Sequence, residues 1–276
     1  MTFKYFSHNG NILPVEQAVI PLSNIEYSYG FGVYETIRVT NRIPYFLKDH
    51  VERLLESARI IELEHSFSDA FIENAISELI EKNEVATCNL KILLIGGRVK
   101  EDASLNILAL NPLFPDKKLY KNGVHCTTYR YERLFPHAKT LNMLGSYLAY
   151  RKAKEAGAYD ALFLNHNGDI TEGTRTNFFC IKDKRIVSPP EAEILLGVTR
   201  KVLMKIAKEN GYAFEESRIT LSDLKDYDGA FITSTSSKIL PIRSIDSLTL
   251  CEPPLALRNL GLLFDEFLRN CKGALT

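Results

Sequence analysis

Cysteine is scarce in this sequence, and its placement argues against a framework built on cysteine. The 276 residues contain five cysteines, an odd number, and they are widely spread with no C-x-x-C pair. Disulfide-stabilised domains and structural zinc sites are built from paired, closely spaced cysteines. The pattern therefore predicts reduced thiols and a cytoplasmic protein.

Long apolar runs and an excess of one charge are also missing. No stretch approaches the roughly 20 apolar residues needed to cross a bilayer. The first ten residues lack the apolar core and small-residue cleavage site of a secretory signal. Lys plus Arg and Asp plus Glu both number 34. We therefore expect neither a membrane nor a nucleic acid as partner.

Length and composition are those of a globular enzyme. The chain is 45% hydrophobic and 25% charged, which is ordinary for such proteins, and its length suits one large or two modest domains. The stretch 111–118 carries two prolines and is the predicted boundary. We predict an N-terminal domain at 1–115, a linker with the next domain's first strand at 116–130, and a C-terminal domain at 131–276.

Local patterns predict a mixture of strands and helices, and therefore an α+β fold. Asn9-Gly10 indicates a hairpin turn. Asp49 and Ser68 have the chemistry of N-caps before two amphipathic helices. Further helices are predicted at 142–156, at 199–210 and after Pro253-Pro254, with hairpins around 165–168 and 183–184.

The stretch from Lys139 to Asn177 contains the most informative pair of side chains. Lys139 stands just before an apolar helix, where a partly buried amine loses its proton more easily. Glu172 ends a predicted strand. Such a lysine can form a Schiff base with the aldehyde of pyridoxal phosphate (PLP), and such a carboxylate can keep its pyridine nitrogen protonated. A solvated lysine and a turn-capping glutamate are the ordinary alternatives.

A phosphate site can be sought separately. Gly197-Val198-Thr199 leads into a helix whose free N–H groups and dipole favour an anion. The run Ser234-Thr235-Ser236-Ser237 offers hydroxyl groups and turn amides, and Arg53 on a predicted helix could add a charge-assisted bond. The alternatives are that Thr199 is an ordinary N-cap, the run a plain polar loop, and Arg53 a solvated cation.

Metal and dinucleotide sites are not indicated. The six histidines show no metal-ligand spacing, so we predict no metal. Neither Gly30-Phe31-Gly32 nor Gly96-Gly97-Arg98 fits the G-x-G-x-x-G fingerprint.

Four stretches spread over nearly the whole chain carry a family resemblance in their order and spacing. Together they resemble the fold-type IV PLP enzymes, or class IV aminotransferases. That family includes branched-chain and D-amino-acid aminotransferases and 4-amino-4-deoxychorismate lyase. The stretches are Tyr29–Arg38 with His50–Leu54, Lys139–Gly157, Glu172–Phe179, and Gly197–Arg200 with Thr233–Ile242.

The resemblance implies roles for individual residues. Lys139 would bind the cofactor PLP as a Schiff base and act as the catalytic base, and Glu172 would pair with the pyridine nitrogen. Tyr34 would lie near the lysine and the substrate. The phosphate would be held by Arg53, Val198, Thr199 and Thr235, with Ser234 beside them.

The resemblance also implies an architecture. The expected fold is that of D-amino-acid aminotransferase, with a small N-terminal α/β domain and a larger C-terminal domain of barrel-like β structure with helices. The cofactor would lie between the domains. We expect a homodimer with shared active sites, in which Asn24–Tyr29 contributes to the neighbouring subunit.

Substrate binding is where this sequence departs from its relatives. Those acting on branched-chain or D-amino acids often hold the α-carboxylate with an arginine on the strand near 91–98, but neither usual pattern is reproduced. Arg98 and Ser236 are candidates, together with Tyr34. Arg175 stands where relatives have small residues, so we hypothesise that its guanidinium binds a substrate carboxylate. The alternative is that Arg175 turns outward and pairs with a surface acid.

The predicted function is a transaminase that moves an amino group between an amino acid and a 2-oxo acid. D-amino acids come slightly before branched-chain L-amino acids, because the hydroxyl residues after Glu172 and at 233–237 look closer to the D-amino-acid type. An aminodeoxychorismate lyase that releases pyruvate is the alternative. An inactive PLP-binding homologue is the alternative from another class.

Overall fold

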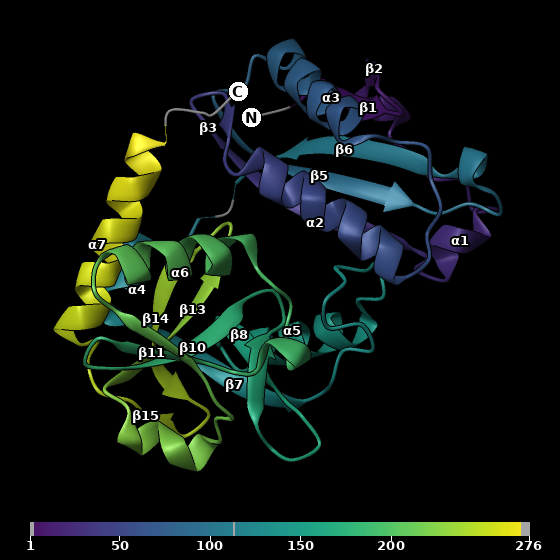
Figure 1. The fold of residues 1–276 in the computed structure, drawn as a ribbon. Coiled ribbons are helices and arrows are strands. Elements are labelled where there is room, and N and C mark those ends of the chain that lie inside the picture. Colours follow the sequence, from purple (N-terminus) through teal and green to yellow (C-terminus); the bar gives the residue numbers. More distant parts are fainter. Residues whose placement is uncertain (1–2, 113, 272–276) are drawn as a thin grey trace. The chain divides into compact units, whose positions relative to one another are not determined.

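The computed structural model describes residues 3–112 and 114–271. Contacts divide the chain into two compact units (Figure 1). Within the described residues, the first unit comprises 3–112 and His137–Met143, and the second comprises Phe114–Pro136 and Leu144–Cys271. The predicted domain limits, 1–115, 116–130 and 131–276, stay a prediction, because compact units need not be independently folding domains.

The first unit is built on a six-stranded antiparallel sheet with strand order β2-β1-β6-β5-β3-β4. The predicted turn at Asn9-Gly10 joins β1 and β2, and both turn residues have positive φ, 49° and 81°, as a type I′ turn requires. The strands are β1 Tyr5–His8, β2 Asn11–Pro14, β3 Gly32–Thr40, β4 Ile43–Pro44, β5 Thr87–Ile95 and β6 Ser104–Leu110.

Two long helices of the first unit pack against this sheet. They are α2 Leu47–Ile60 and α3 Asp69–Lys82, while α1 Ile25–Ser28 is a single short turn. Alternate residues of a strand share one face, and the buried side chains of β3, β5 and β6 alternate in this way to form one core with both long helices. That core includes Ile37, Leu54, Ile76, Leu79, Leu90, Ile92 and Ile107.

The N-cap prediction is confirmed for one helix and wrong for the other. Ser68 caps α3, because its side chain accepts a hydrogen bond from the Phe71 N–H. Asp49 does not cap α2: the helix starts at Leu47, and Phe46 takes the N-cap position in a left-handed conformation. Asp49 lies instead within the first turn, where a carboxylate favours the positive end of the helix dipole.

The second unit is a closed β-barrel with an extension. Its strand order is β12-β11-β10-β13-β14-β7-β8-β9, and β10 also pairs with β9 through Asn177 and Glu172. This last pairing closes the sheet and confirms the predicted α+β fold with a barrel-like second part. The strands are β7 Val124–Arg130, β8 Asp160–Leu164, β9 Ile170–Gly173, β10 Asn177–Lys182, β11 Arg185–Ser188, β12 Ala213–Glu216, β13 Gly229–Ser234, β14 Lys238–Ile245 and β15 Leu248–Thr249.

Four α-helices accompany the barrel in the described part of the second unit. They are α4 Lys117–Asn122, α5 Leu144–Glu155, α6 Val198–Glu209 and α7 Leu255–Asn270. Helix α4 was not predicted, because the two prolines before it indicated only a break. Asp116 begins it by accepting a hydrogen bond from the Lys118 N–H. Short 3-10 helices are η1 Val15–Gln17, η2 Lys100–Asp102, η3 Glu191–Glu193 and η4 Leu221–Asp226.

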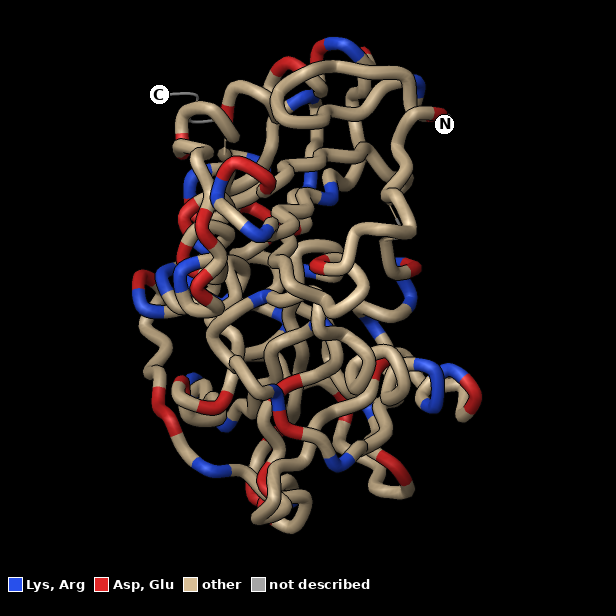
Figure 2. Tube along the Cα trace, turned by 90° about the vertical axis from the view of Figure 1, so that its right-hand side faces the viewer, with Lys and Arg blue, Asp and Glu red and all other residues tan. Residues whose placement is uncertain are grey.

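Charged residues of both signs are interspersed along the described chain (Figure 2), as the equal numbers of acidic and basic residues lead one to expect. Across residues 3–112 and 114–271, every helix is too short or too polar to span a bilayer.

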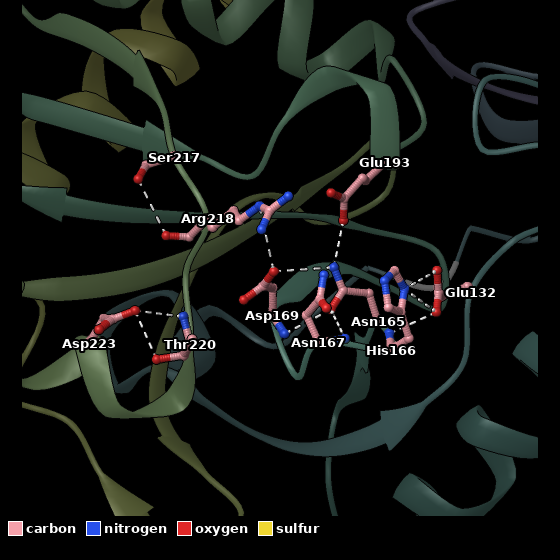
Figure 3. Close-up of polar contacts among 10 residues, drawn as sticks. All are labelled: Glu132, Asn165, His166, Asn167, Asp169, Glu193, Ser217, Arg218, Thr220 and Asp223. Carbon is pink, nitrogen blue, oxygen red and sulfur yellow. Dashed lines mark hydrogen bonds and ion pairs between the residues drawn. The ribbon is translucent and has the colours of Figure 1, made fainter.

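A polar network holds the turn between β8 and β9 (Figure 3). The side-chain oxygen of Asn165 accepts hydrogen bonds from the backbone N–H groups of Asn167 and Asp169, and its Nδ2 donates to Glu193 Oε2 at 2.7 Å. Arg218 Nε lies 3.9 Å from Asp169 Oδ2. The network ties this turn to η3, the segment that leads towards α6.

Candidate active site

Lys139 is held against the start of β3 in the first unit. Its carbonyl accepts the Tyr34 N–H at 2.9 Å, and its own N–H donates to Ser57 Oγ at 3.1 Å. The adjacent Thr140 forms a β-bridge with Val33. These backbone contacts place the half-buried lysine with its Nζ 4.4 Å from the centroid of the Tyr34 ring. The predicted catalytic pair Lys139 and Tyr34 is thus brought together.

A buried cluster of charged and polar groups lies in the same unit. Glu35 is almost completely buried, and the Arg53 guanidinium contacts both of its carboxylate oxygens, with Nε 2.6 Å from Oε1 and Nη2 2.9 Å from Oε2. His50 Nδ1 lies 2.8 Å from Glu35 Oε2. Burial raises the pKa of Glu35, but Arg53 and His50 together hold the pKa far below its ordinary value. Burial lowers the pKa of His50, so the neutral ring donates from Nδ1.

This cluster bears on the predicted role of Arg53. Two of the three guanidinium nitrogens of Arg53 donate to Glu35, so the plane of the group is fixed. Binding of phosphate by Arg53 stays a prediction. Sequence reasoning missed Glu35 and His50. The available signals were an acidic residue inside the apolar strand, and the placement of His50 and Arg53 three residues apart on one helix face.

Glu172 occupies the seam of the barrel in the second unit. Its carboxylate is buried, with Oε1 2.7 Å from Arg133 Nε, an ion pair that lacks hydrogen-bond geometry. Its Oε2 accepts the Leu195 N–H at 3.2 Å, and Asn177 donates to the Leu195 carbonyl at 2.7 Å. Sequence reasoning missed Arg133, for which no spacing motif gave a signal.

The start of α6 is open to an anion. Gly197 occupies the N-cap position, no side chain caps the helix, and its first turn contains no acidic residue. The alternative that Thr199 is the N-cap is therefore wrong. A Cβ at position 197 would lie only 2.1 Å from Asn177 Oδ1, so a larger residue there would displace the Asn177 side chain that holds the Leu195 carbonyl. The backbone N–H groups of Val198 and Thr199 lie in the first turn, where helices bind phosphate.

The predicted hydroxyl run forms a turn between β13 and β14. Ser234 Oγ lies 2.7 Å from Ser237 Oγ and accepts the Ser237 N–H at 3.1 Å. Thr235 and Ser236 are half-buried between these two serines. Their contact with phosphate or substrate stays a prediction.

The two candidate arginines have different surroundings. Arg175 is exposed, and its guanidinium carbon lies 4.3 Å from the centroid of the Tyr150 ring. Throughout the described residues, no acidic side chain lies within ion-pair distance of Arg175, so the alternative of a surface ion pair is not observed there. Arg98 is also exposed, with its Nε 3.8 Å from Glu26 Oε1.

The predicted site residues are divided between the two units. The first unit contains Lys139, Tyr34, Arg53 and Arg98, and the second contains Glu172, Arg175, Val198, Thr199, Ser234, Thr235 and Ser236.

Comparison with known proteins decides the family. The family model for amino-transferase class IV matches residues 32–245. This chain belongs to the class IV aminotransferases. It is 32% identical to the D-alanine aminotransferase of Bacillus licheniformis, over 88% of both chains. It is 30% identical to a putative branched-chain-amino-acid aminotransferase of Methanocaldococcus jannaschii, over 86% of both chains.

A solved structure agrees with the family. A branched-chain amino acid aminotransferase of T.th., solved with pyridoxamine 5'-phosphate, superposes with a TM-score of 0.88 at 27% identity. The superposition covers 96% of this chain and 94% of that one. Class IV aminotransferases depend on PLP, so this aminotransferase is a PLP enzyme.

The side chains of the aminotransferase suit this cofactor. PLP needs an amine for its aldehyde, an anionic partner for its ring nitrogen and an anion site for its phosphate. Lys139, whose amine lies beside an aromatic ring, would supply the amine, the buried Glu172 would supply the carboxylate, and the uncapped start of α6 would supply the anion site.

Glu35 provides a test of the buried cluster. Its folded-state pKa lies below the ordinary value of 4.5, so its contribution to stability is complete above that pH and is lost as the pH falls. Glu35→Gln removes the buried negative charge that pairs with Arg53 and should lower the free energy of unfolding at neutral pH by about 3 kcal/mol. In this variant the free energy of unfolding should also decrease less steeply as the pH falls below 4.5, because the titrating carboxylate is gone. Urea denaturation across this pH range measures both effects.

Glu56→Gln is the matched control. Glu56 also accepts two hydrogen bonds from one arginine, Arg59, but both side chains are exposed, so its removal should change stability little. His50 also has a lowered pKa, and its contribution is lost as the pH falls through 6.5. The stability losses of the two variants are therefore compared above pH 7, where His50 is neutral in both the folded and the unfolded chain. If Glu35→Gln and Glu56→Gln lower the free energy of unfolding equally, burial does not strengthen the contribution of Glu35 to stability.

Proposed function

We propose that this aminotransferase transfers the amino group of D-amino acids to 2-oxo acids, with branched-chain L-amino acids as the next candidate donors. Two observations support D-amino acids: the hydroxyl residues after Glu172, and the 32% identity to a D-alanine aminotransferase. The observation that carries the assignment of a carboxylate-bearing substrate is the placement of Arg175 on the turn that follows Glu172, with no acidic side chain of the described residues within ion-pair distance.

The side chains divide the work as follows. Lys139 would hold the cofactor covalently, and its amine would move the proton of the substrate Cα. Glu172, beside Arg133, would keep the proton on the pyridine nitrogen. PLP when bound would supply the electron sink that stabilises charge at Cα. The phosphate would be held by Arg53, Val198, Thr199, Ser234 and Thr235, and the substrate by Tyr34, Arg98, Ser236 and Arg175.

A panel of D- and L-amino acids tests the substrate class. We expect D-alanine and D-glutamate to convert the cofactor to its amine form, seen as loss of the bound-aldehyde absorbance, faster than L-leucine and L-valine. Borohydride reduction followed by mass mapping should label Lys139, and the Lys139→Ala variant serves as the unlabelled control.

Each other outcome rejects a specific part of the proposal. Conversion by L-leucine but not by D-alanine would assign branched-chain specificity. Pyruvate release from aminodeoxychorismate without conversion of the cofactor would assign the lyase reaction. A labelled Lys139 without conversion of the cofactor by any amino acid would indicate an inactive PLP-binding homologue, and an unlabelled Lys139 would reject its role as the lysine that binds PLP.

Arg175 should bind the substrate carboxylate. A charge-assisted hydrogen bond contributes about 1.5–3 kcal/mol, so Arg175→Ala should raise KM for the amino acid about 10- to 100-fold. Steady-state kinetics measure this change, and cofactor titration should show unchanged PLP binding. Arg151→Ala is the control, because Arg151 is an exposed arginine of the same unit that pairs with Glu155. An unchanged KM would end the assignment.

We further propose a homodimer with shared active sites. The segment 19–29 supports this idea, because it exposes several large apolar side chains in the single chain: Val19, Leu22, Ile25, Tyr27 and Tyr29. Leu22 is fully exposed and Tyr29 is 83% exposed. Exposed apolar clusters are costly in water and mark interaction surfaces. The segment includes Asn24–Tyr29, the stretch expected to reach the neighbouring subunit.

Analytical ultracentrifugation tests the assembly. The native protein should sediment as a dimer, and Leu22→Asp should raise the dissociation constant at least tenfold, because a charge would be buried without a partner. Leu255→Asp is the control, since Leu255 is 73% exposed on α7 of the other unit. A native monomer, or an equal effect of both substitutions, would argue against the proposed interface.

We also propose a cytoplasmic location, as predicted from the sequence. All five cysteines are free thiols, which suits a reducing compartment.

A further inference from the structure

The turn that carries Arg175 rests on a buried carboxylate. Asp160, at the start of β8, is fully buried. Its Oδ1 accepts a short hydrogen bond from the Thr174 hydroxyl and another from the Ala161 N–H at 2.9 Å. Its Oδ2 accepts the Thr176 hydroxyl at 2.9 Å. Both side chains that flank Arg175 are therefore fastened to the same aspartate.

The three residues of the turn divide into two groups. Thr174 and Thr176 are buried and directed at Asp160, whereas Arg175 between them is exposed. Gly173 allows this arrangement, because a Cβ there would lie 2.1 Å from Thr176 Oγ1 and 2.6 Å from Asp160 Oδ2. The sequence of this turn thus serves two purposes: its hydroxyl groups satisfy a buried charge, which would otherwise be costly, and its cation stays accessible.

The guanidinium group has a second support. The ring of Tyr150, on α5, lies 4.3 Å from the guanidinium carbon of Arg175. A guanidinium over an aromatic face is stabilised by cation–π attraction, and its N–H edge stays free for a carboxylate. Burial raises the pKa of Asp160, and the hydrogen bond from Thr174 and the positive charge of Arg175 oppose this rise. The side chain is therefore supported from the ring and from the turn.

We propose that Asp160 is a positioning residue for substrate recognition: through Thr174 and Thr176 it fixes the turn that presents Arg175 to the substrate carboxylate. This inference rests on the proposed role of Arg175. A cation that is already oriented loses less conformational freedom when substrate binds, so fixing it strengthens binding. In this proposal Asp160 does not contact the substrate. Tyr150 is a second positioning residue, because its ring stacks on the guanidinium of Arg175.

The two threonines allow a test that leaves Asp160 in place. Replacing both by valine, which has the same shape, removes the two hydroxyl donors. The Thr174→Val/Thr176→Val variant should raise KM for the amino acid about tenfold, the effect of losing roughly 1.4 kcal/mol of binding. The kcat and the affinity for PLP should stay within about twofold of the native values. The Thr174→Ser/Thr176→Ser variant keeps both hydroxyl groups and should restore the native KM.

A double-mutant cycle separates positioning from general weakening of the fold. If the threonines act through Arg175, the valine pair should have no further effect on KM in the Arg175→Ala background. Asp160→Asn is the second variant: it should raise KM in the native background but not in the Arg175→Ala background. Thermal unfolding confirms that each variant is folded. If the Thr174→Val/Thr176→Val variant does not fold, the Asp160→Asn variant tests the positioning role in its place.

The outcomes distinguish the two proposals. If the threonine or aspartate substitutions raise KM by the same factor with and without Arg175, they act independently of Arg175, and the positioning role is overturned. The same holds if the threonine and aspartate variants keep the native KM while Arg175→Ala raises it. If Arg175→Ala itself leaves KM unchanged, both the positioning role and the substrate role of Arg175 are rejected.

Discussion

The backbone pairing of Glu172 with Asn177 closes the barrel of the second unit. The same two residues use their side chains to hold the N–H and the carbonyl of Leu195, close to the start of α6. Closure of the sheet and placement of α6, the helix for which phosphate binding is proposed, therefore depend on one pair of residues. Because strand register cannot slip without turning side chains to the other face, the Glu172 carboxylate is placed by the backbone rather than by a flexible side chain.

Buried carboxylates recur in both units, and each is matched by its own set of donors. Glu35 is matched by Arg53 and His50, and Asp160 by two hydroxyl groups and a backbone N–H. Burying a charge is costly unless it is paired and hydrogen-bonded. The physical consequence is rigidity, because a matched buried carboxylate restrains every group that donates to it. Glu35 restrains Arg53, the proposed phosphate ligand, directly, and we propose that Asp160 restrains Arg175, the proposed substrate ligand, through Thr174 and Thr176.

Turns and helix caps were predicted correctly where one or two residues determine the local structure. The prediction was wrong where several neighbouring residues could take the N-cap position. The Asn9-Gly10 turn and the Ser68 cap were predictable because the turn or cap residues themselves supply the required chemistry. The Asp49 cap was wrong because Phe46 accepts the left-handed conformation that ends the preceding turn. Arg133 was missed for another reason: its partner Glu172 is distant in sequence, and no periodicity connects the two.

The amino-acid sequence alone was enough to predict the α+β fold class, most of the strands and helices, the family and hence PLP, because these follow from local periodicity and from motif order along the chain. The partners of each charge emerged only from the folded chain. There, Thr174 and Thr176 hold Asp160 while Arg175 stacks on Tyr150. The physical reason is that such contacts depend on strand register and helix packing between distant segments. A pattern of residue types cannot specify them.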